Sequence, residues 1–254
     1  AGIKALSSDI LVNSVNIGRG KGAVASNTAV GTDAISATAT GTDNAALGYN
    51  ALKVVTSGAR NTVVGSLAAA SLTTGNDNSV LGYQALKNNT TGASNVAIGK
   101  DALLANSTGY NNVAIGTSSL LGNTTGFSNI AMGLDSALSN TTGNDNLAIG
   151  QSALRLNTTG VANSAIGGNA LYATTTGNYN SALGWQSLAG NTTGIDNVAV
   201  GYDAGRYDAS GNTPMTTSSF SVYLGASTKG LNATGSVNET VIGNAAVGLG
   251  SNST

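Results

Sequence analysis

The chain contains no cysteine and no histidine among its 254 residues. The missing cysteine excludes disulfide bonds and thiolate nucleophiles. The missing histidine removes the commonest metal ligand and the usual general base near neutral pH. We therefore expect no metal site, no cofactor and no catalysis that depends on either residue type.

Charged and aromatic residues are scarce as well, at 8% and 4% of the chain. The net charge of −1 offers no basic surface, so we expect neither nucleic acid nor an anionic membrane as a partner. No apolar run approaches the ~20 residues of a membrane-spanning helix. With 36 glycines, one proline and few bulky side chains, the chain must bury small residues in an ordered stack rather than in an ordinary globular core.

What the chain does have is a 17-residue repeat. One asparagine column recurs at this spacing, at Asn27, Asn44, Asn61, Asn78, Asn95, Asn112, Asn129, Asn146, Asn163, Asn180 and Asn197. A glycine follows each of these by four residues, as at Gly31, Gly48, Gly65, Gly82 and Gly99, and from Gly41 to Gly194 a second glycine precedes the asparagine by three. A short period repeated this often is typical of a solenoid.

The repeat unit, as in NTTGASNVAIGKDALLA, has no helical spacing. Glycine every 7 to 10 residues, with asparagine and threonine beside it, would interrupt any helix. Each stretch between glycines has the length of one short strand and a turn. We therefore predict an all-β fold, a parallel β-solenoid (β-roll) of 17-residue coils with two short strands per coil.

Alternation along the strand NVAIG separates two faces. One carries large apolar residues: Leu47, Leu81, Ile98, Ile115, Met132, Ile149, Ile166, Leu183 and Val200. We expect this column inside the coil, against a second column of Leu52, Leu86, Leu103, Leu120, Leu154, Leu171 and Leu188. The other face carries alanine at nearly every copy. Because a strand that is apolar on both faces is buried on both, we expect a second copy of the chain to cover the alanine face, which makes a homo-oligomer.

The asparagine and glycine columns are predicted to be structural. Both residue types tolerate the left-handed backbone of tight corners, and asparagine amides can bond along a stack of identical coils. We extend this interpretation to a second asparagine column at Asn89, Asn106, Asn123, Asn140, Asn157 and Asn191.

Irregular spacing at both ends divides the chain. Residues 1–26 are an irregular lead-in in which IGRGKGAVASNTAVG begins a shortened coil, and residues 27–205 form the regular solenoid. Residues 206–220, around Pro214, are an inserted loop that leaves the stack. Residues 221–254 are degenerate coils that end the chain.

Candidate functional residues are few. Exposed aromatic side chains are the receptor-binding candidates, with covering of the coil edges as the alternative: Tyr49, Tyr83, Tyr110, Phe127, Tyr179, Trp185 and Tyr202. Carboxylates at Asp43, Asp77, Asp145 and Asp196 raise the possibility of glycan cleavage, but their common place before the repeated asparagine favours turn formation. Paired threonines such as Thr90 and Thr91 raise ice binding as a third class.

The segments IGRGKGAVASNTAVG, GTDNAALG and NVAIGKDAL resemble the head repeats of trimeric autotransporter adhesins, whose pattern is S-V-A-I-G-x-x-A. The resemblance covers roughly residues 13–205. It implies a left-handed parallel β-roll and a homotrimer with small apolar columns toward its axis. The period here is three residues longer, with NTTG in the added turn, and in this form it looks like the shafts of bacteriophage tail fibres and tailspikes. The ending NETVIGNAAVGLGSNST is similar to the segment that precedes a self-cleaving chaperone in such fibres.

These observations favour a non-enzymatic fibre shaft that binds a cell-surface glycan or protein receptor. The expected location is extracellular, on a virion or on a bacterial surface. The alternatives are the head of a bacterial trimeric adhesin, a purely structural filament or spacer, and an ice-binding solenoid.

Overall fold

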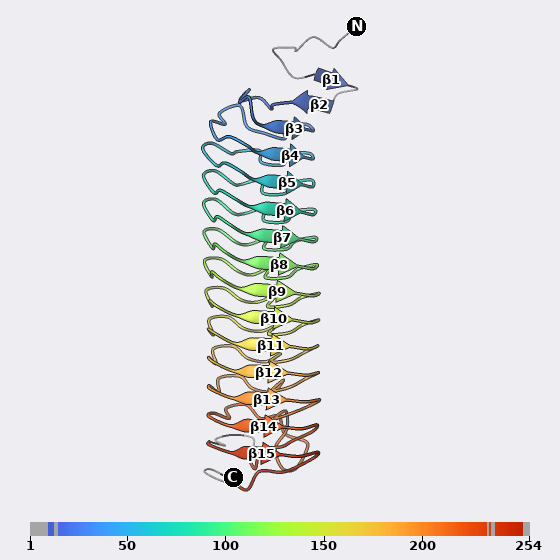
Figure 1. Cartoon of the computed structure of the whole chain (residues 1–254), viewed down its shortest axis with the longest axis vertical. Coiled ribbons are helices and arrows are strands. Elements are labelled where there is room, and N and C mark those ends of the chain that lie inside the picture. The colour runs from blue at the N-terminus through green and yellow to red at the C-terminus, as the bar shows by residue number, and fades with distance from the viewer. Residues whose placement is uncertain (1–9, 13–14, 233, 235–236, 251–254) are drawn as a thin grey trace. The chain divides into compact units, whose positions relative to one another are not determined.

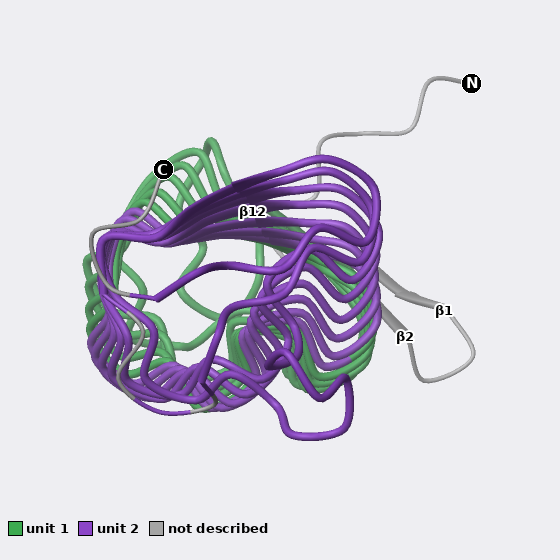
Figure 2. Cartoon of the chain, turned by 90° about the horizontal axis from the view of Figure 1, so that it is seen from below, with its two compact units in different colours: residues 1–117 green, residues 118–254 purple. Residues whose placement is uncertain are grey.

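The computed structural model describes residues 10–12, 15–232, 234 and 237–250. In these residues it is an all-β parallel solenoid with about 17 residues per turn, which confirms the predicted fold class (Figure 1). The chain divides into two compact units, unit 1 (residues 1–117) and unit 2 (residues 118–254), coloured separately in Figure 2.

Unit 1 begins with an antiparallel pair, β1 (Ile10–Val12) and β2 (Val15–Gly18). Strand β2 also pairs antiparallel with β3 (Thr28–Val30), with Ile17 opposite Val30. The shortened coil that we predicted here is therefore wrong, because a coil would place β2 parallel to β3. From β3 onward the strands are parallel: β4 (Ala45–Leu47), β5 (Thr62–Val64), β6 (Ser79–Leu81), β7 (Val96–Ile98) and β8 (Val113–Ile115).

Unit 2 continues the pattern with seven parallel strands: β9 (Ile130–Met132), β10 (Leu147–Ile149), β11 (Ser164–Ile166), β12 (Ser181–Leu183), β13 (Val198–Val200), β14 (Val222–Leu224) and β15 (Thr240–Ile242). Up to β13 each residue pairs with the one 17 positions on, as Ala165 does with Ala182. Between β13 and β14 the register widens, and Val198 pairs with Val222. This spacing is seven residues longer than the repeat, and the chain accommodates the excess in a hairpin in which Tyr207 pairs with Pro214. The parts of the predicted ends at residues 1–9, 13–14, 233, 235–236 and 251–254 lie outside the described residues.

Each regular coil contains one three-residue strand, not the two that we predicted. The segment opposite the strand is a succession of turns in which non-glycine residues adopt left-handed φ, for example Gln84 (56°) and Leu86 (53°). Residues with such φ values interrupt an extended strand. The segment still bonds between coils, because Leu86 N donates to Ala102 O at 2.9 Å and Asp101 N donates to Tyr83 O at 3.0 Å.

The two faces of the strand are reversed from our prediction. Ala97 is fully buried, whereas Ile98 is 37% exposed and Leu81 is 51% exposed. The alanine column therefore faces the coil interior, and the large apolar column faces outward. The reason is that the coil interior is narrow. Both asparagine columns and the predicted leucine column, including Leu103, are also buried there, so the space on the strand side suits a side chain as small as a methyl group.

The glycine column after the strand has positive φ. Gly82 has φ of 145°, and a Cβ atom on it would lie 2.4 Å from the carbonyl oxygen of Gly99 in the next coil. L-residues rarely adopt that φ, and neighbouring backbone cannot move aside. This column therefore keeps successive coils in close contact.

Candidate functional site

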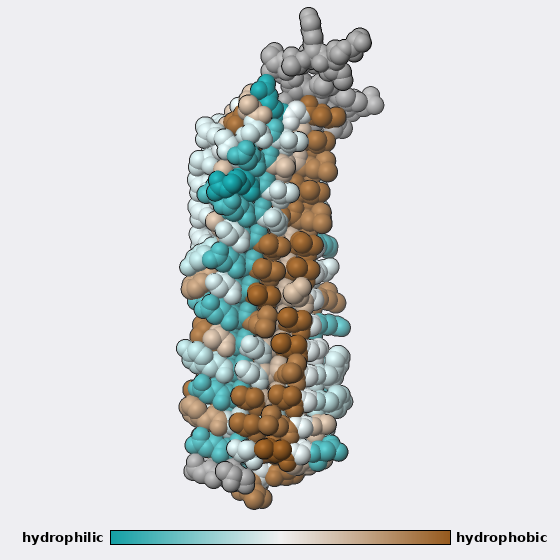
Figure 3. All heavy atoms as spheres, in the orientation of Figure 1, coloured by the Kyte–Doolittle hydropathy of each residue, from teal (hydrophilic) through white to brown (hydrophobic). Residues whose placement is uncertain are grey.

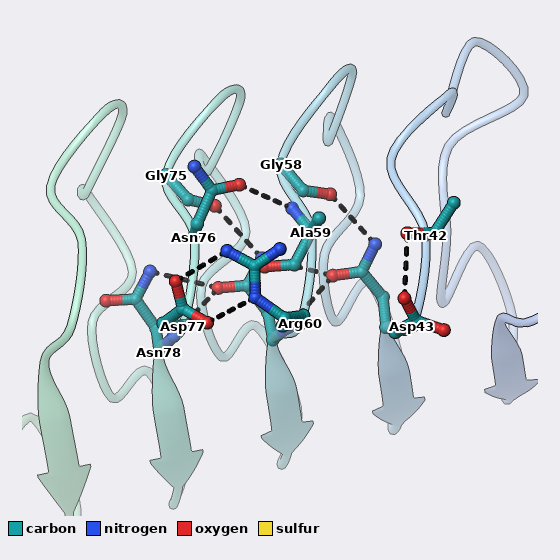
Figure 4. A network of polar contacts seen from close by, with 11 residues as sticks. Thr42, Asp43, Gly58, Ala59, Arg60, Gly75, Asn76, Asp77 and Asn78 are labelled. Atoms are coloured by element: carbon teal, nitrogen blue, oxygen red, sulfur yellow. Dashed lines mark hydrogen bonds and ion pairs between the residues drawn. The ribbon is translucent and has the colours of Figure 1, made fainter.

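The first asparagine column forms a buried hydrogen-bond ladder. Asn61 N donates to the side-chain oxygen of Asn44 at 3.0 Å, and Asn61 Nδ2 donates to Gly75 O at 2.9 Å. Figure 4 shows this corner in unit 1. The asparagines themselves are not left-handed, contrary to our expectation; the preceding residue is, as at Arg60 (57°) and Asp77 (60°). The ladder satisfies backbone donors and acceptors at each corner, which gives it a structural role.

The second asparagine column forms a parallel ladder inside each unit. In unit 1, Asn106 Nδ2 donates to Asn89 Oδ1 at 2.9 Å, and in unit 2, Asn157 Nδ2 donates to Asn140 Oδ1 at 2.7 Å. Thr174 interrupts the column, and the buried Oδ1 of Asn157 has no hydrogen-bond partner. These side chains are buried and are not available to a ligand.

The aspartate column lies at exposed corners, each residue having left-handed φ. Arg60 Nε donates to Asp77 Oδ1 at 2.6 Å and Arg60 Nη2 donates to Asp77 Oδ2 at 2.8 Å (Figure 4). These hydrogen bonds hold the pKa of the Asp77 carboxyl below its ordinary value and raise the pKa of Arg60. The position supports the turn interpretation. In the described part of the chain, no three Asp, Glu, His or Cys side chains are grouped so that they could hold a metal ion.

Six of the seven aromatic candidates are exposed, with fractions between 43% and 59%: Tyr49, Tyr83, Tyr110, Tyr179, Trp185 and Tyr202. Phe127 is half-buried. Trp185 and Tyr202 occupy neighbouring coils, since Asp203 N donates to Trp185 O at 2.9 Å. The indole ring of Trp185 lies over Gly168 in the preceding coil, where a Cβ would be 2.3 Å from its ring. The aromatic residues are therefore scattered along the coil edges rather than gathered around one pocket.

The threonine pairs are divided between two roles. Thr73 Oγ1 donates to Thr90 O at 2.9 Å, and Thr90 Oγ1 donates to Ser107 O at 3.1 Å, so this column bonds to backbone. The neighbouring column, with Thr74 and Thr91, is exposed. One threonine column per unit faces solvent, and it lies in the turn.

The outer face of the strands is a further candidate site. The alternation along the strand had led us to place this face in the coil interior. We call it the apolar strand face; its members that are more than a third exposed are Leu47, Leu81 and Ile98 in unit 1 and Ile130, Met132, Leu183, Val198, Val200 and Ile242 in unit 2. Apolar side chains gather over the strands in the space-filling view (Figure 3). Within each unit, exposed apolar side chains on neighbouring strands, such as Leu81 and Ile98 or Leu183 and Val200, form a surface of the kind that is typical of interaction sites.

Unit 2 also has an open pocket of about 570 Å³ next to the inserted hairpin. Its lining combines aromatic, amide, guanidinium and aliphatic groups: Asn169, Tyr172, Ala173, Gln186, Ala189, Gly190, Thr192, Arg206, Pro214 and Thr216. Sequence reasoning located the loop around Pro214 but missed the pocket. A signal for it was the shrinking column Leu156, Ala173, Gly190, which removes side-chain volume over three successive coils.

No family model, curated protein or solved structure matches the chain. In the described residues no helix has the length and apolar character that are needed to cross a bilayer.

Proposed function

We propose that the chain is a non-enzymatic fibre shaft that associates with copies of itself through the apolar strand face and attaches its bearer to a cell surface. The observation that carries the proposal is the exposure of large aliphatic side chains at successive coils, such as Leu183 (50%) and Val200 (40%). Buried apolar surface stabilises by ~25 cal/mol per Å², so covering this face provides a driving force for association.

A second copy of this chain is the partner that fits the apolar strand face best. The apolar residues repeat once per coil, with a spacing of ~4.8 Å between strands. A partner in contact along several coils must present side chains at the same spacing, and a parallel copy of the solenoid does so. The resemblance to trimeric adhesins and phage fibres leads us to propose three copies, with the apolar strand face toward the axis, because the small alanine column that we expected there is buried inside the coil.

Sedimentation of the intact chain tests self-association. We expect the mass of a trimer, and a chain that remains a monomer at micromolar concentration would refute the proposal. Ile98→Asp and Leu183→Asp place charges on the apolar strand face and are expected to dissociate the oligomer while the circular dichroism spectrum is preserved. The matched control is Thr91→Asp, which adds the same charge to the exposed turn and is expected to leave the oligomer intact.

Attachment is the second half of the proposal, with a glycan or protein receptor on a host cell as the partner. Exposed rings such as Trp185 and Tyr179 offer flat apolar surfaces that sugars and protein loops contact, and an oligomer would present each site several times. We place the fibre outside the cell, on a phage tail or a bacterial surface. Retention of the labelled chain on host cells tests this, and a lack of retention on every candidate host would favour a structural spacer.

Ice binding is supported by one observation, the exposed threonine column that includes Thr74 and Thr91. Thermal hysteresis measurements separate it from the shaft proposal. We expect no hysteresis, because a single threonine column in a turn provides no broad flat surface.

A further inference from the structure

The pocket in unit 2 arises from small residues between larger ones. In one column Leu156 is followed, coil by coil, by Ala173 and Gly190. In the adjacent column Ala189 lies between Tyr172 and Arg206. Backbone bonds align these coils, because Leu156 N donates to Tyr172 O and Ala173 N donates to Ala189 O, both at 3.1 Å. The hollow therefore has Tyr172 on one side, Arg206 on the other and an aliphatic floor between them.

The inserted hairpin closes another side of the pocket. A Cβ atom on Gly190 would lie 2.7 Å from Cβ of Pro214 and 3.1 Å from Met215 O, so glycine is required for the hairpin to pack here. Met215 is fully buried and anchors the returning strand of the hairpin in the core. The register of unit 2 widens between β13 and β14, and the hairpin that is inserted there forms one wall of the pocket.

The polar groups around the pocket are held in position. Arg155 Nη1 donates to the hydroxyl of Tyr172 at 3.2 Å, and its guanidinium carbon lies 5.9 Å from the ring centroid. Arg206 donates to Asp203 at 3.0 Å and to Gln186, and its guanidinium covers the ring of Tyr207 at 4.6 Å. Side chains fixed in this way present oriented donors and acceptors without a large ordering cost on binding.

Charge is balanced at Arg206, which lines the pocket, and at Arg155, which contacts Tyr172 from outside the lining. Arg155 lies 3.7 Å from Asp135, and Arg206 is paired with Asp203. Because each guanidinium already has a carboxylate, the pocket does not favour a phosphate or a carboxylate ligand. The rim is polar, with amides at Asn169 and Gln186, which disfavours a lipid tail.

We propose that this pocket binds a neutral saccharide of one or two pyranose rings. The ring of Tyr172 and the surface of Ala173 and Pro214 suit the C–H face of a pyranose, while the amides and guanidinium supply hydrogen bonds for its hydroxyls. The volume lies within the ~300–1,000 Å³ of ligand pockets. Saccharide binding itself does not depend on the proposed function, because the pocket lies outside the apolar strand face. Only the role of the saccharide as a receptor rests on that proposal.

Binding is tested with the full chain on a panel of neutral oligosaccharides (hexose and N-acetylhexosamine units), sialylated and uronic-acid oligosaccharides, and inorganic phosphate, by calorimetry and ligand-observed NMR. We expect saturable binding of at least one neutral oligosaccharide and none of phosphate. Absence of binding to every neutral member, or preference for the acidic ones, would overturn the proposal.

Two variants locate the site. Tyr172→Ala removes the ring, and Ala173→Leu fills the floor with the side chain that the preceding coil carries at Leu156. Each is expected to weaken binding at least tenfold. The matched control Phe220→Ala removes a 50% exposed ring outside the pocket and is expected to leave the affinity unchanged; loss in the control but not in the pocket variants would refute the placement. Sedimentation of the same samples reports self-association separately, so a failure of the shaft proposal is distinguishable from a failure of this one.

Discussion

Asn61 and Asn78 are 17 residues apart, and one side-chain oxygen joins them: Oδ1 of Asn61 accepts hydrogen bonds from both the backbone N and Nδ2 of Asn78, each at 3.0 Å. Nδ2 of Asn78 also donates to Gly92 O at 3.1 Å. Both asparagines are fully buried. Each asparagine side chain thus bonds to backbone of the coil that follows it, Asn61 through Asn78 N and Asn78 through Gly92 O, so the column links successive coils.

Asn78→Ala is expected to destabilise the protein by about 2 to 4 kcal/mol. The substitution removes the two hydrogen bonds that Asn78 Nδ2 donates and leaves the buried backbone N of Asn95 without its acceptor, and an unsatisfied buried group costs ~1–3 kcal/mol. Urea unfolding at fixed protein concentration measures the change. The control is Asn88→Ala at an exposed position, and equal effects of the two substitutions would contradict the structural role of the ladder.

Thr174→Asn is expected to stabilise the protein by about 1 kcal/mol. The substitution restores an amide where the second ladder is interrupted and provides a donor for the buried Oδ1 of Asn157, which has no partner. Thr174→Val serves as the comparison, since it removes the 3.0 Å bond from Thr174 Oγ1 to Asn191 O without adding an amide, and a loss of stability is expected. Stabilisation by valine but not by asparagine would count against this account.

Gly225 and Gly243 allow backbone strain to be separated from steric overlap. Their φ values are 128° and 129°, but a Cβ on Gly225 would lie 2.4 Å from Gly243 O, whereas a Cβ on Gly243 would have its nearest neighbour at 3.6 Å. We expect Gly243→Ala to cost about 1 to 2 kcal/mol from strain alone. Gly225→Ala should cost clearly more in the same thermal unfolding experiment, and similar costs would show that coil contact is unimportant here.

Tyr223 is expected to make stability decrease in strongly alkaline solution. Burial raises the pKa of its phenol to about 12, with the nearby Glu239 carboxylate adding to the effect, and the ring is fully buried. The neutral phenol is therefore favoured in the folded state, so its contribution is complete below pH 10 and is lost as the pH rises from about 10 to about 12. A shift of this size corresponds to about 2 to 3 kcal/mol.

Urea unfolding between pH 9 and pH 12 measures the alkaline loss, and Tyr223→Phe is the comparison. The phenylalanine variant lacks the titrating group but retains the ring, so its stability should fall less steeply over the same interval. Parallel curves for the two proteins would show that ionisation of Tyr223 is not coupled to unfolding.

The repeat period made much of the fold predictable, because columns 17 residues apart determine which residues lie side by side in a parallel stack. The orientation of the strand was not predictable in the same way. Parity separates Ala97 from Ile98, but only the width of the coil decides which of them is inside. The single strand per coil was also missed, since left-handed φ at leucines such as Leu86 contradicts local preference and is maintained by bonds between coils.

The candidate sites, like the fold, could be predicted from the sequence only in part. The aromatic residues could be recognised as candidates from their columns, and six of them are exposed. The pocket beside Tyr172 depends on where the hairpin returns, and nothing in the spacing of the repeat predicts that Pro214 packs against Gly190. Insertions in a repeat protein can therefore be located from sequence, but the surfaces that they create follow from packing.

The 17-residue register has a consequence for inheritance. Since a residue in the regular coils pairs with its equivalents one coil away, deleting or duplicating a whole repeat joins two equivalent edges and preserves the pattern of hydrogen bonds between coils. Unequal recombination between repeats would thus change the length of such a protein in steps of ~4.8 Å while preserving every coil. Length becomes a heritable trait that is counted in coils.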